Sequence, residues 1–132
     1  MSAKLIFTNG CFDVLHKAHV ELLQFAKSLG NHLIVGLNSD ASVKKVKGKN
    51  RPINCQVDRK LILESIRYVD EVVIFDDETP WNLIKTINPD IIVKGGDYSP
   101  SEVVGNDLCE IVIFNWIDGY STTKAIQDLT DR

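Results

Sequence analysis

The sequence predicts an α/β fold in which a parallel sheet of about five strands carries helices on both faces. Short runs of apolar and β-branched residues alternate with segments in which apolar residues recur at helical spacing. The short runs are apolar throughout, which is typical of strands buried on both faces of a sheet. The length of 132 residues lies within the usual size of one domain. We therefore expect residues 1–132 to fold as a single domain.

The first predicted β-α-β unit occupies the N-terminal part of the chain. KLIFTN at residues 4–9 and HLIVGLN at residues 32–38 are rich in apolar and β-forming residues, so both are predicted as strands. Between them, VELLQFAKSLG has apolar residues at helical spacing and ends in Gly30, a residue that commonly terminates helices. Two strands joined by a helix in this way are expected to pair in parallel.

The same alternation continues along the rest of the chain. The further predicted elements are a helix near residues 57–68, strands at 71–75, 90–95 and 110–116, and a last helix from about Ser121. Two polar segments, residues 39–54 and 95–106, each follow the C-terminal end of a predicted strand. Open α/β sheets bind ligands at that edge, so we expect both segments to be functional loops.

Composition and charge limit the classes of function. The net charge at pH 7 is -3, so the protein lacks the overall positive field that nucleic acids or anionic membranes attract. Cys11, Cys55 and Cys109 show no metal-site spacing, which favours reduced thiols. The N-terminal apolar stretch is too short for a signal peptide or a membrane span. We expect a cytoplasmic protein that binds neither nucleic acid nor membrane.

The strongest local signal is the segment TNGCFDVLHKAH. A strand is predicted to end at Asn9 and Gly10, and a helix to begin near His19. His16 and His19 are three residues apart, which places both on one face at the helix N-terminus, where free N–H groups attract anions. Gly10 lets the backbone approach a ligand closely. The pair is a candidate triphosphate site. The alternatives are a metal-ligating pair, although no third ligand stands nearby, and a simple helix cap.

Two motifs in this chain resemble those of a known family. GCFDVLHKAH resembles the HxGH signature of the cytidylyltransferase-like nucleotidyltransferases, and STTK at residues 121–124 resembles their second signature. The resemblance extends from about Phe7 to Leu129, with the motifs in the family's order. It implies a Rossmann-like fold and an enzyme that transfers a nucleoside monophosphate from a nucleoside triphosphate to a phosphorylated small molecule. Ala18 departs from the pattern, because the family usually has glycine there.

Within the family, three segments are similar to adenylyltransferases acting on D-glycero-β-D-manno-heptose 1-phosphate. These are NSDASVKKVKGKNRPIN, KGGDY and DGYSTT. DRKLILESIRYVDEV is instead similar to glycerol-3-phosphate cytidylyltransferases. We favour the heptose branch, because Trp116 stands where the cytidylyl signature begins with arginine and because KGGDY is not the cytidylyl pattern. Two further interpretations stay open: a flavin-mononucleotide adenylyltransferase, and a nucleotide-binding module without turnover, which Ala18 suggests.

The resemblance also implies roles for individual residues. His16 and His19 would stabilise the transition state, and Lys47, or Lys44 as the near alternative, would neutralise the triphosphate. The residues implied in nucleotide binding are Thr8, Asn9, Gly10, Phe12, Lys44, Gly95, Asp97, Ser121, Thr122 and Thr123. The residues implied in substrate binding are Asp13, Asp40 and Arg59. The two aspartates are equally typical of turns and helix caps, and the arginine of an exposed helix position.

The same reasoning gives the expected cofactor and partners. Mg²⁺ is expected on the phosphates of ATP without a dedicated protein site, since this ion keeps few protein ligands. The acidic run at residues 76–80 is explained by a helix start, with Thr79 as N-cap and Pro80 as the first helical residue. The expected partners are ATP, a phosphorylated small-molecule acceptor and a second copy of the chain in a homodimer. A separate sugar kinase would supply the acceptor.

Overall fold

A computed structural model describes residues 3–96 and 98–115, and within them the chain forms one five-stranded sheet. The strands are β1 (Leu5–Gly10), β2 (His32–Asn38), β3 (Glu71–Phe75), β4 (Ile91–Gly95) and β5 (Glu110–Phe114). All neighbouring strands are parallel, and their order across the sheet is β3-β2-β1-β4-β5. The predicted parallel sheet is therefore confirmed.

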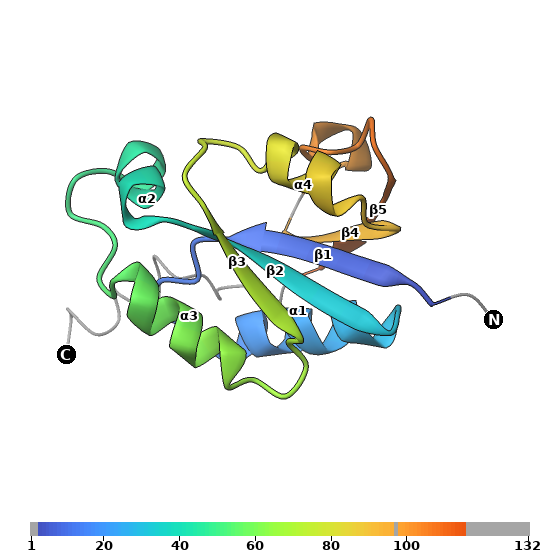
Figure 1. The fold of residues 1–132 in the computed structure, drawn as a ribbon, viewed down its shortest axis with the longest axis horizontal. Coiled ribbons are helices and arrows are strands. Elements are labelled where there is room, and N and C mark those ends of the chain that lie inside the picture. Colours follow the sequence, from blue (N-terminus) through green and yellow to red (C-terminus); the bar gives the residue numbers. More distant parts are fainter. Residues whose placement is uncertain (1–2, 97, 116–132) are drawn as a thin grey trace.

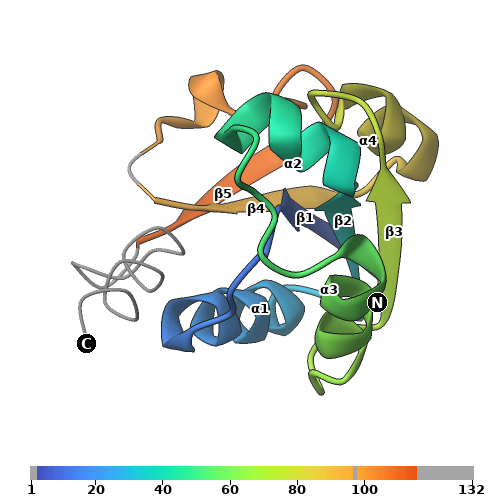
Figure 2. The same cartoon turned by 90° about the vertical axis from the view of Figure 1, so that its left-hand side faces the viewer.

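Helices cover both faces of the sheet, as predicted. The helices are α1 (Lys17–Ser28), α2 (Asp40–Lys47), α3 (Gln56–Glu64) and α4 (Trp81–Ile87), with a short 3-10 helix, η1 (Pro100–Glu102), after β4. Helices α1 and α3 lie against one face, and α2 and α4 lie against the other (Figure 1). Figure 2 shows the same two helical layers with the sheet between them. In the part of the chain that the structure describes, no helix is both long enough and apolar enough to span a membrane.

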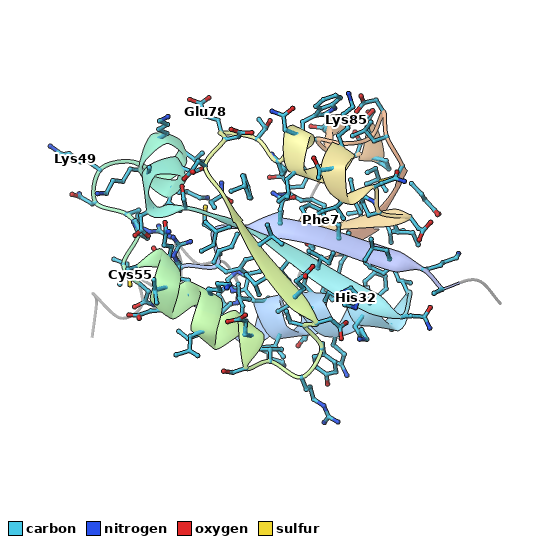
Figure 3. All side chains as sticks on the ribbon, in the orientation of Figure 1. Phe7, His32, Lys49, Cys55, Glu78 and Lys85 are labelled. Carbon is cyan, nitrogen blue, oxygen red and sulfur yellow. The ribbon has the colours of Figure 1, made fainter. Side chains whose placement is uncertain are left out.

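Successive strand side chains enter two separate cores. On one face, Ile6 of β1 packs in a cluster with Leu23 of α1 and Leu63 of α3. On the opposite face, Phe7 packs in a cluster with Ile84 of α4, and Figure 3 shows it at the centre of the molecule. Because both faces are buried, side chains of either direction are apolar, which explains the continuous apolar runs in the sequence.

Residues 39–54, predicted as a polar loop, contain helix α2, so that part of the prediction is wrong. The Ser39 hydroxyl caps this helix by accepting a hydrogen bond from the backbone N–H of Ser42. Val43 is fully buried, whereas Val46 is 51% exposed. The segment has only two valines, three residues apart, so its helical signal in the sequence is short and resembles a polar loop. The lysines of this segment therefore lie largely on a helix.

The start of α4 also differs from the prediction. Thr79 is not the N-cap, because Pro80 occupies that position and Trp81 is the first helical residue. The carbonyl of Pro80 accepts the first helical hydrogen bond from the N–H of Ile84, at 2.8 Å. The Pro80 backbone itself lies outside the helical region, which is the defining feature of an N-cap.

Candidate active site

The carboxyl ends of β1 and β4 separate at the centre of the sheet. β1 pairs with β4 over Ile6 and Phe7 only, whereas its pairing with β2 continues to Gly10. The hydroxyl of Thr8, which was predicted to bind nucleotide, donates a buried hydrogen bond of 2.7 Å to the carbonyl of Val93. The order of the strands reverses at this pair, and such a switch point is where open α/β sheets bind ligands.

His16 and His19 lie together at the N-terminus of α1, beside this switch point. The helix begins at Lys17, earlier than predicted, and His16 is its N-cap. Nδ1 of His16 accepts a hydrogen bond from the backbone N–H of Ala18, at 3.2 Å. Nδ1 of His19 accepts one from the backbone N–H of His16, at 3.3 Å. The two rings are stacked with their centroids 3.9 Å apart, so the predicted pairing on one helix face is confirmed.

These hydrogen bonds fix the protonation of both imidazoles. A neutral imidazole has one donor and one acceptor nitrogen, so an accepting Nδ1 leaves the proton on Nε2. Burial lowers the pKa of His16, and burial together with the nearby His16 lowers the pKa of His19 to about 3. Both rings are therefore neutral Nε2–H donors at pH 7. Their capping contacts and a role as donors to an anion are compatible, since they use different nitrogens.

We expect nuclear magnetic resonance of the imidazole nitrogens to show this state directly. At pH 7 both His16 and His19 should give the neutral Nε2–H pattern, and His19 should not protonate until the pH approaches about 3. Because its folded-state pKa lies below the ordinary 6.5, this group stabilises the fold above pH 6.5 and loses that contribution as the pH falls. A His19 midpoint near 6.5, or an Nδ1–H pattern, would contradict the assignment.

Phe12 supports His19 from the core side. Its side chain is 5% exposed, and its ring meets the His19 ring edge-on with 5.3 Å between centroids. The backbone of Phe12 has φ +44°, a left-handed conformation that side-chain-bearing residues rarely adopt. A Cβ atom at Gly10 would lie 3.1 Å from the Phe12 ring, so glycine there makes room for the ring. These contacts place Phe12 behind the histidines as a positioning residue.

Asp13 joins the turn after β1 to the segment after α2. It is 1% exposed, and its carboxylate accepts hydrogen bonds from the backbone N–H groups of Ile53 and Asn54 and from Nε of Arg51, at 2.7–2.9 Å. Burial acts to raise the pKa of Asp13, but the two backbone N–H groups and the guanidinium outweigh it and hold the pKa below its ordinary value. The carboxylate is thus engaged within the protein, and these contacts give no support to its predicted role in substrate binding.

Arg59 is a buried residue of α3, so the alternative interpretation of an exposed helix arginine is wrong. Its Nε donates to the carbonyl of Asn54 at 2.9 Å, and its Nη1 donates to the carbonyls of Cys11 and Asn38, both at 2.8 Å. Its Nη2 pairs with the carboxylate of Asp40 at 2.9 Å. The side chain is fully buried, so the predicted contact with an acceptor phosphate has no support either. Arg59 ties the ends of β1 and β2 to the segment that precedes α3.

The two candidate lysines belong to α2. Lys44 and Lys47 are both exposed, and Lys47 is the last residue of the helix. Burial raises the pKa of Cys11, and the ammonium of Lys47 partly opposes that rise, which shows that Lys47 lies near the turn after β1. Of the two lysines, Lys47 is therefore the one placed toward the switch point.

The remaining predicted residues fall into two groups. Asn9 and Gly95 are half-buried at the carboxyl ends of β1 and β4, at the same edge as the histidines. Asp97, Ser121, Thr122 and Thr123 lie outside the described residues. Their predicted roles in nucleotide binding stay predictions.

Three residues of this region were missed by sequence reasoning. Arg51 and Asn54 hold Asp13, but nothing in the spacing of the polar segment that contains them indicates this contact. Lys94 interrupts the apolar run of β4 one residue before the strand ends. A charged residue inside a buried strand is unusual, and this signal could have marked Lys94 as a candidate.

Comparison with known proteins gives the family. A model of the cytidylyltransferase-like family matches residues 7–128. The chain belongs to the cytidylyltransferase-like family. This agrees with the resemblance of the HxGH-like and STTK segments, and it makes the chain a nucleotidyltransferase.

Individual relatives support this membership. The bifunctional protein HldE of Wolinella succinogenes is 54% identical over 127 residues, and that of Nitratiruptor sp. is 55% identical over 125 residues. These alignments cover 96% and 94% of this chain, but the chain spans only 27% of the length of either relative.

Solved structures confirm the Rossmann-like fold of this cytidylyltransferase-like chain. A lipopolysaccharide core biosynthesis protein from Thermoplasma volcanium superposes with a TM-score of 0.76 at 24% identity, over 89% of this chain and 100% of that one. A bifunctional NMN adenylyltransferase/ADP ribose pyrophosphatase from Francisella tularensis, complexed with AMP and a manganese ion, gives a TM-score of 0.69 at 18% identity. It covers 98% of this chain and 42% of that one.

Proposed function

We propose that this chain transfers the adenylyl group of ATP to a sugar 1-phosphate, giving an ADP-sugar and pyrophosphate. The acceptor proposed is D-glycero-β-D-manno-heptose 1-phosphate. The observation that carries the proposal is the pair of neutral imidazoles, His16 and His19, fixed at the start of α1 beside the switch point. The choice of ATP and heptose rests on the resemblance of NSDASVKKVKGKNRPIN, KGGDY and DGYSTT.

The reaction is an in-line displacement at the α-phosphorus of ATP. An acceptor phosphate oxygen forms the new P–O bond while the bond to pyrophosphate breaks, and pyrophosphate leaves with the electron pair. A phosphomonoester has a second pKa of about 6, so at pH 7 it is largely a dianion and needs no general base. The protein must instead align two anions that repel each other and stabilise the charge that develops between them.

The side chains at the switch point supply that stabilisation. The Nε2–H groups of His16 and His19 donate to phosphate oxygens, and because both rings are neutral they need no protonation before the reaction. Donors held in place beforehand cost no reorganisation in the transition state, which makes such stabilisation large. Lys47 neutralises the triphosphate from the end of α2. Asp13, Arg59 and Phe12 hold this arrangement together without touching a substrate.

Mg²⁺ enters this proposal with the nucleotide. Within the described ranges no group of three His, Cys, Asp or Glu side chains could hold a metal ion, and Asp13 and Asp40 are both paired with arginines. Mg²⁺ typically keeps several waters and binds substrate phosphates with one or two protein ligands at most. When bound to ATP, the ion neutralises charge on the triphosphate.

We also propose where the enzyme acts and how many copies of the chain it contains. We place the reaction in the cytoplasm, where ATP is available, and we assign residues 1–132 to a single nucleotidyltransferase domain that acts as a homodimer. The acceptor must already carry a phosphate when it arrives, so a sugar kinase acts first.

A matrix of substrates tests the proposal. The full chain is incubated with Mg²⁺ and either ATP or CTP, against heptose 1-phosphate, glycerol 3-phosphate or flavin mononucleotide, and pyrophosphate release is measured. We expect release with ATP and heptose 1-phosphate. Release only with CTP and glycerol 3-phosphate would move the enzyme to the branch that DRKLILESIRYVDEV resembles. If the chain binds a nucleotide but releases no pyrophosphate with any pair of nucleotide and acceptor, a nucleotide-binding module without turnover would be favoured.

A further inference from the structure

Lys94 places a second ammonium group at the switch point. It precedes the last residue of β4 and pairs in register with Ile113 of β5. Its neighbour Val93 packs in the core on the α1 and α3 face, and Ile92 in the core on the opposite face. Because strand side chains alternate, Lys94 shares the face of Ile92, which is also the face that α2 covers. Lys47, at the end of α2, lies on that side.

The surroundings of Lys94 are unfavourable for a cation in the ligand-free protein. Burial is the main cause that lowers the pKa of Lys94; Cys11 acts to raise this pKa, and the ammonium of Lys47 lowers it by a smaller effect. Within residues 3–96 and 98–115, the ammonium of Lys94 takes part in no ion pair or hydrogen bond, and it lies over the ring of Tyr98, 5.5 Å from Nζ to the centroid. An anion bound between these two ammonium groups, one half-buried on β4 and the other exposed at the end of α2, reduces their mutual repulsion.

We propose that Lys94 is a phosphate-binding residue of this site, whose ammonium contacts a phosphate oxygen of one of the two substrates opposite Lys47. The inference rests on the proposed function, because it takes the substrates to be ATP and a phosphorylated acceptor. In both cases the group bound is an anionic phosphate, either the triphosphate of ATP or the phosphate dianion of the acceptor. Lys94 thus gives the site a cation from the central sheet itself, on the far side of the switch point from the histidines.

Substitution of Lys94 by methionine tests this assignment. Methionine keeps the unbranched apolar stem and removes the charge. The matched control is Lys85→Met, because Nζ of Lys85 lies in a similar way over the ring of Trp81, at 5.2 Å, but on the exposed surface of α4 (Figure 3). Steady-state pyrophosphate release is measured while ATP and heptose 1-phosphate are varied in turn. We expect Lys94→Met to lower kcat/KM by about tenfold to a hundredfold, as loss of a charge-assisted hydrogen bond does, and Lys85→Met to change it by less than about twofold.

The substrate whose KM rises identifies the phosphate that Lys94 binds. A rise for ATP assigns Lys94 to the triphosphate, and a rise for heptose 1-phosphate assigns it to the acceptor. Lys94→Arg, which keeps the charge, should recover part of the lost kcat/KM. If Lys94→Met leaves kcat/KM for both substrates within about twofold of wild type, the assignment is wrong.

A binding measurement separates this inference from the proposed function. The thermal midpoint of unfolding is recorded with and without ATP or heptose 1-phosphate, which requires no turnover. Ligand-free Lys94→Met should be as stable as wild type or more so, because a half-buried charge is removed, while its stabilisation by one of the two ligands should be lost. A wild-type chain that is stabilised by ATP but releases no pyrophosphate would defeat the proposed function alone. Equal stabilisation of wild type and Lys94→Met by both ligands would defeat the role of Lys94.

Discussion

Replacing His19 by alanine should lower the rate of pyrophosphate release by about a hundredfold or more while the protein stays folded. The ring of His19 is 7% exposed and holds its Nε2 proton through the hydrogen bond that Nδ1 accepts from His16. Alanine removes the Nε2–H donor and leaves nothing in its place. The loss of one helix-cap contact costs about 1 kcal/mol, which is small against a typical total stability of about 5–15 kcal/mol.

Two further variants separate catalysis from helix capping. His19→Asn keeps an oxygen near the position of Nδ1, where it can accept the His16 N–H, but it lacks the distal donor. We expect it to recover the cap contact and not the rate. His32→Ala removes the exposed histidine at the amino end of β2, at the other end of the strand from the switch point, and should leave the rate unchanged (Figure 3). Wild-type turnover in His19→Ala, measured as pyrophosphate release, would exclude the histidine from the mechanism.

The sheet and the histidine pair could be predicted because their signals are local. Each strand is a short run that is apolar on both sides, as the burial of both Ile6 and Phe7 requires, and such runs stand out in a single sequence. The spacing of His16 and His19 determines which face of α1 they share, whatever the rest of the fold does. Helix α1 begins at Lys17, slightly before the predicted start near His19, because His16 is the N-cap and histidine is not a typical N-cap residue.

The contacts that hold the site together could not be predicted, because they depend on distant residues. Asp13 meets Ile53 and Asn54, which lie 40 and 41 residues further along the chain. Nothing in the spacing of the segment 48–55 indicates that it folds back over the turn after β1. Arg59 has the same property, since its acceptors come from three separate segments. Sequence reasoning therefore assigned Arg59 to the ligand, although the fold itself uses its donors.

Replacing Arg59 by methionine should reduce the free energy of unfolding by about 3–5 kcal/mol, because each enclosed acceptor that loses its donor costs about 1–3 kcal/mol. The side chain of Arg59 is 0% exposed, and four of its hydrogen bonds satisfy groups at the centre of the molecule. Methionine fills much of the volume but leaves the carbonyls of Cys11 and Asn38 without these donors. Urea unfolding at pH 7, followed by circular dichroism, gives the change from the transition midpoint and slope.

The controls for Arg59 decide between a structural and a ligand-binding role. Lys60→Met changes the next residue of α3, which forms a surface ion pair with Glu64 at 3.8 Å, and it should alter stability by less than about 0.5 kcal/mol. Arg59→Lys keeps the charge but has three donors in place of five, so its stability should fall between wild type and Arg59→Met. If Arg59→Met unfolds like wild type and only the KM for the acceptor rises, then Arg59 binds substrate after all. If stability falls as expected, Arg59 has a structural role: it fixes the turn between β1 and α1, and so positions His16 and His19, without contacting the ligand.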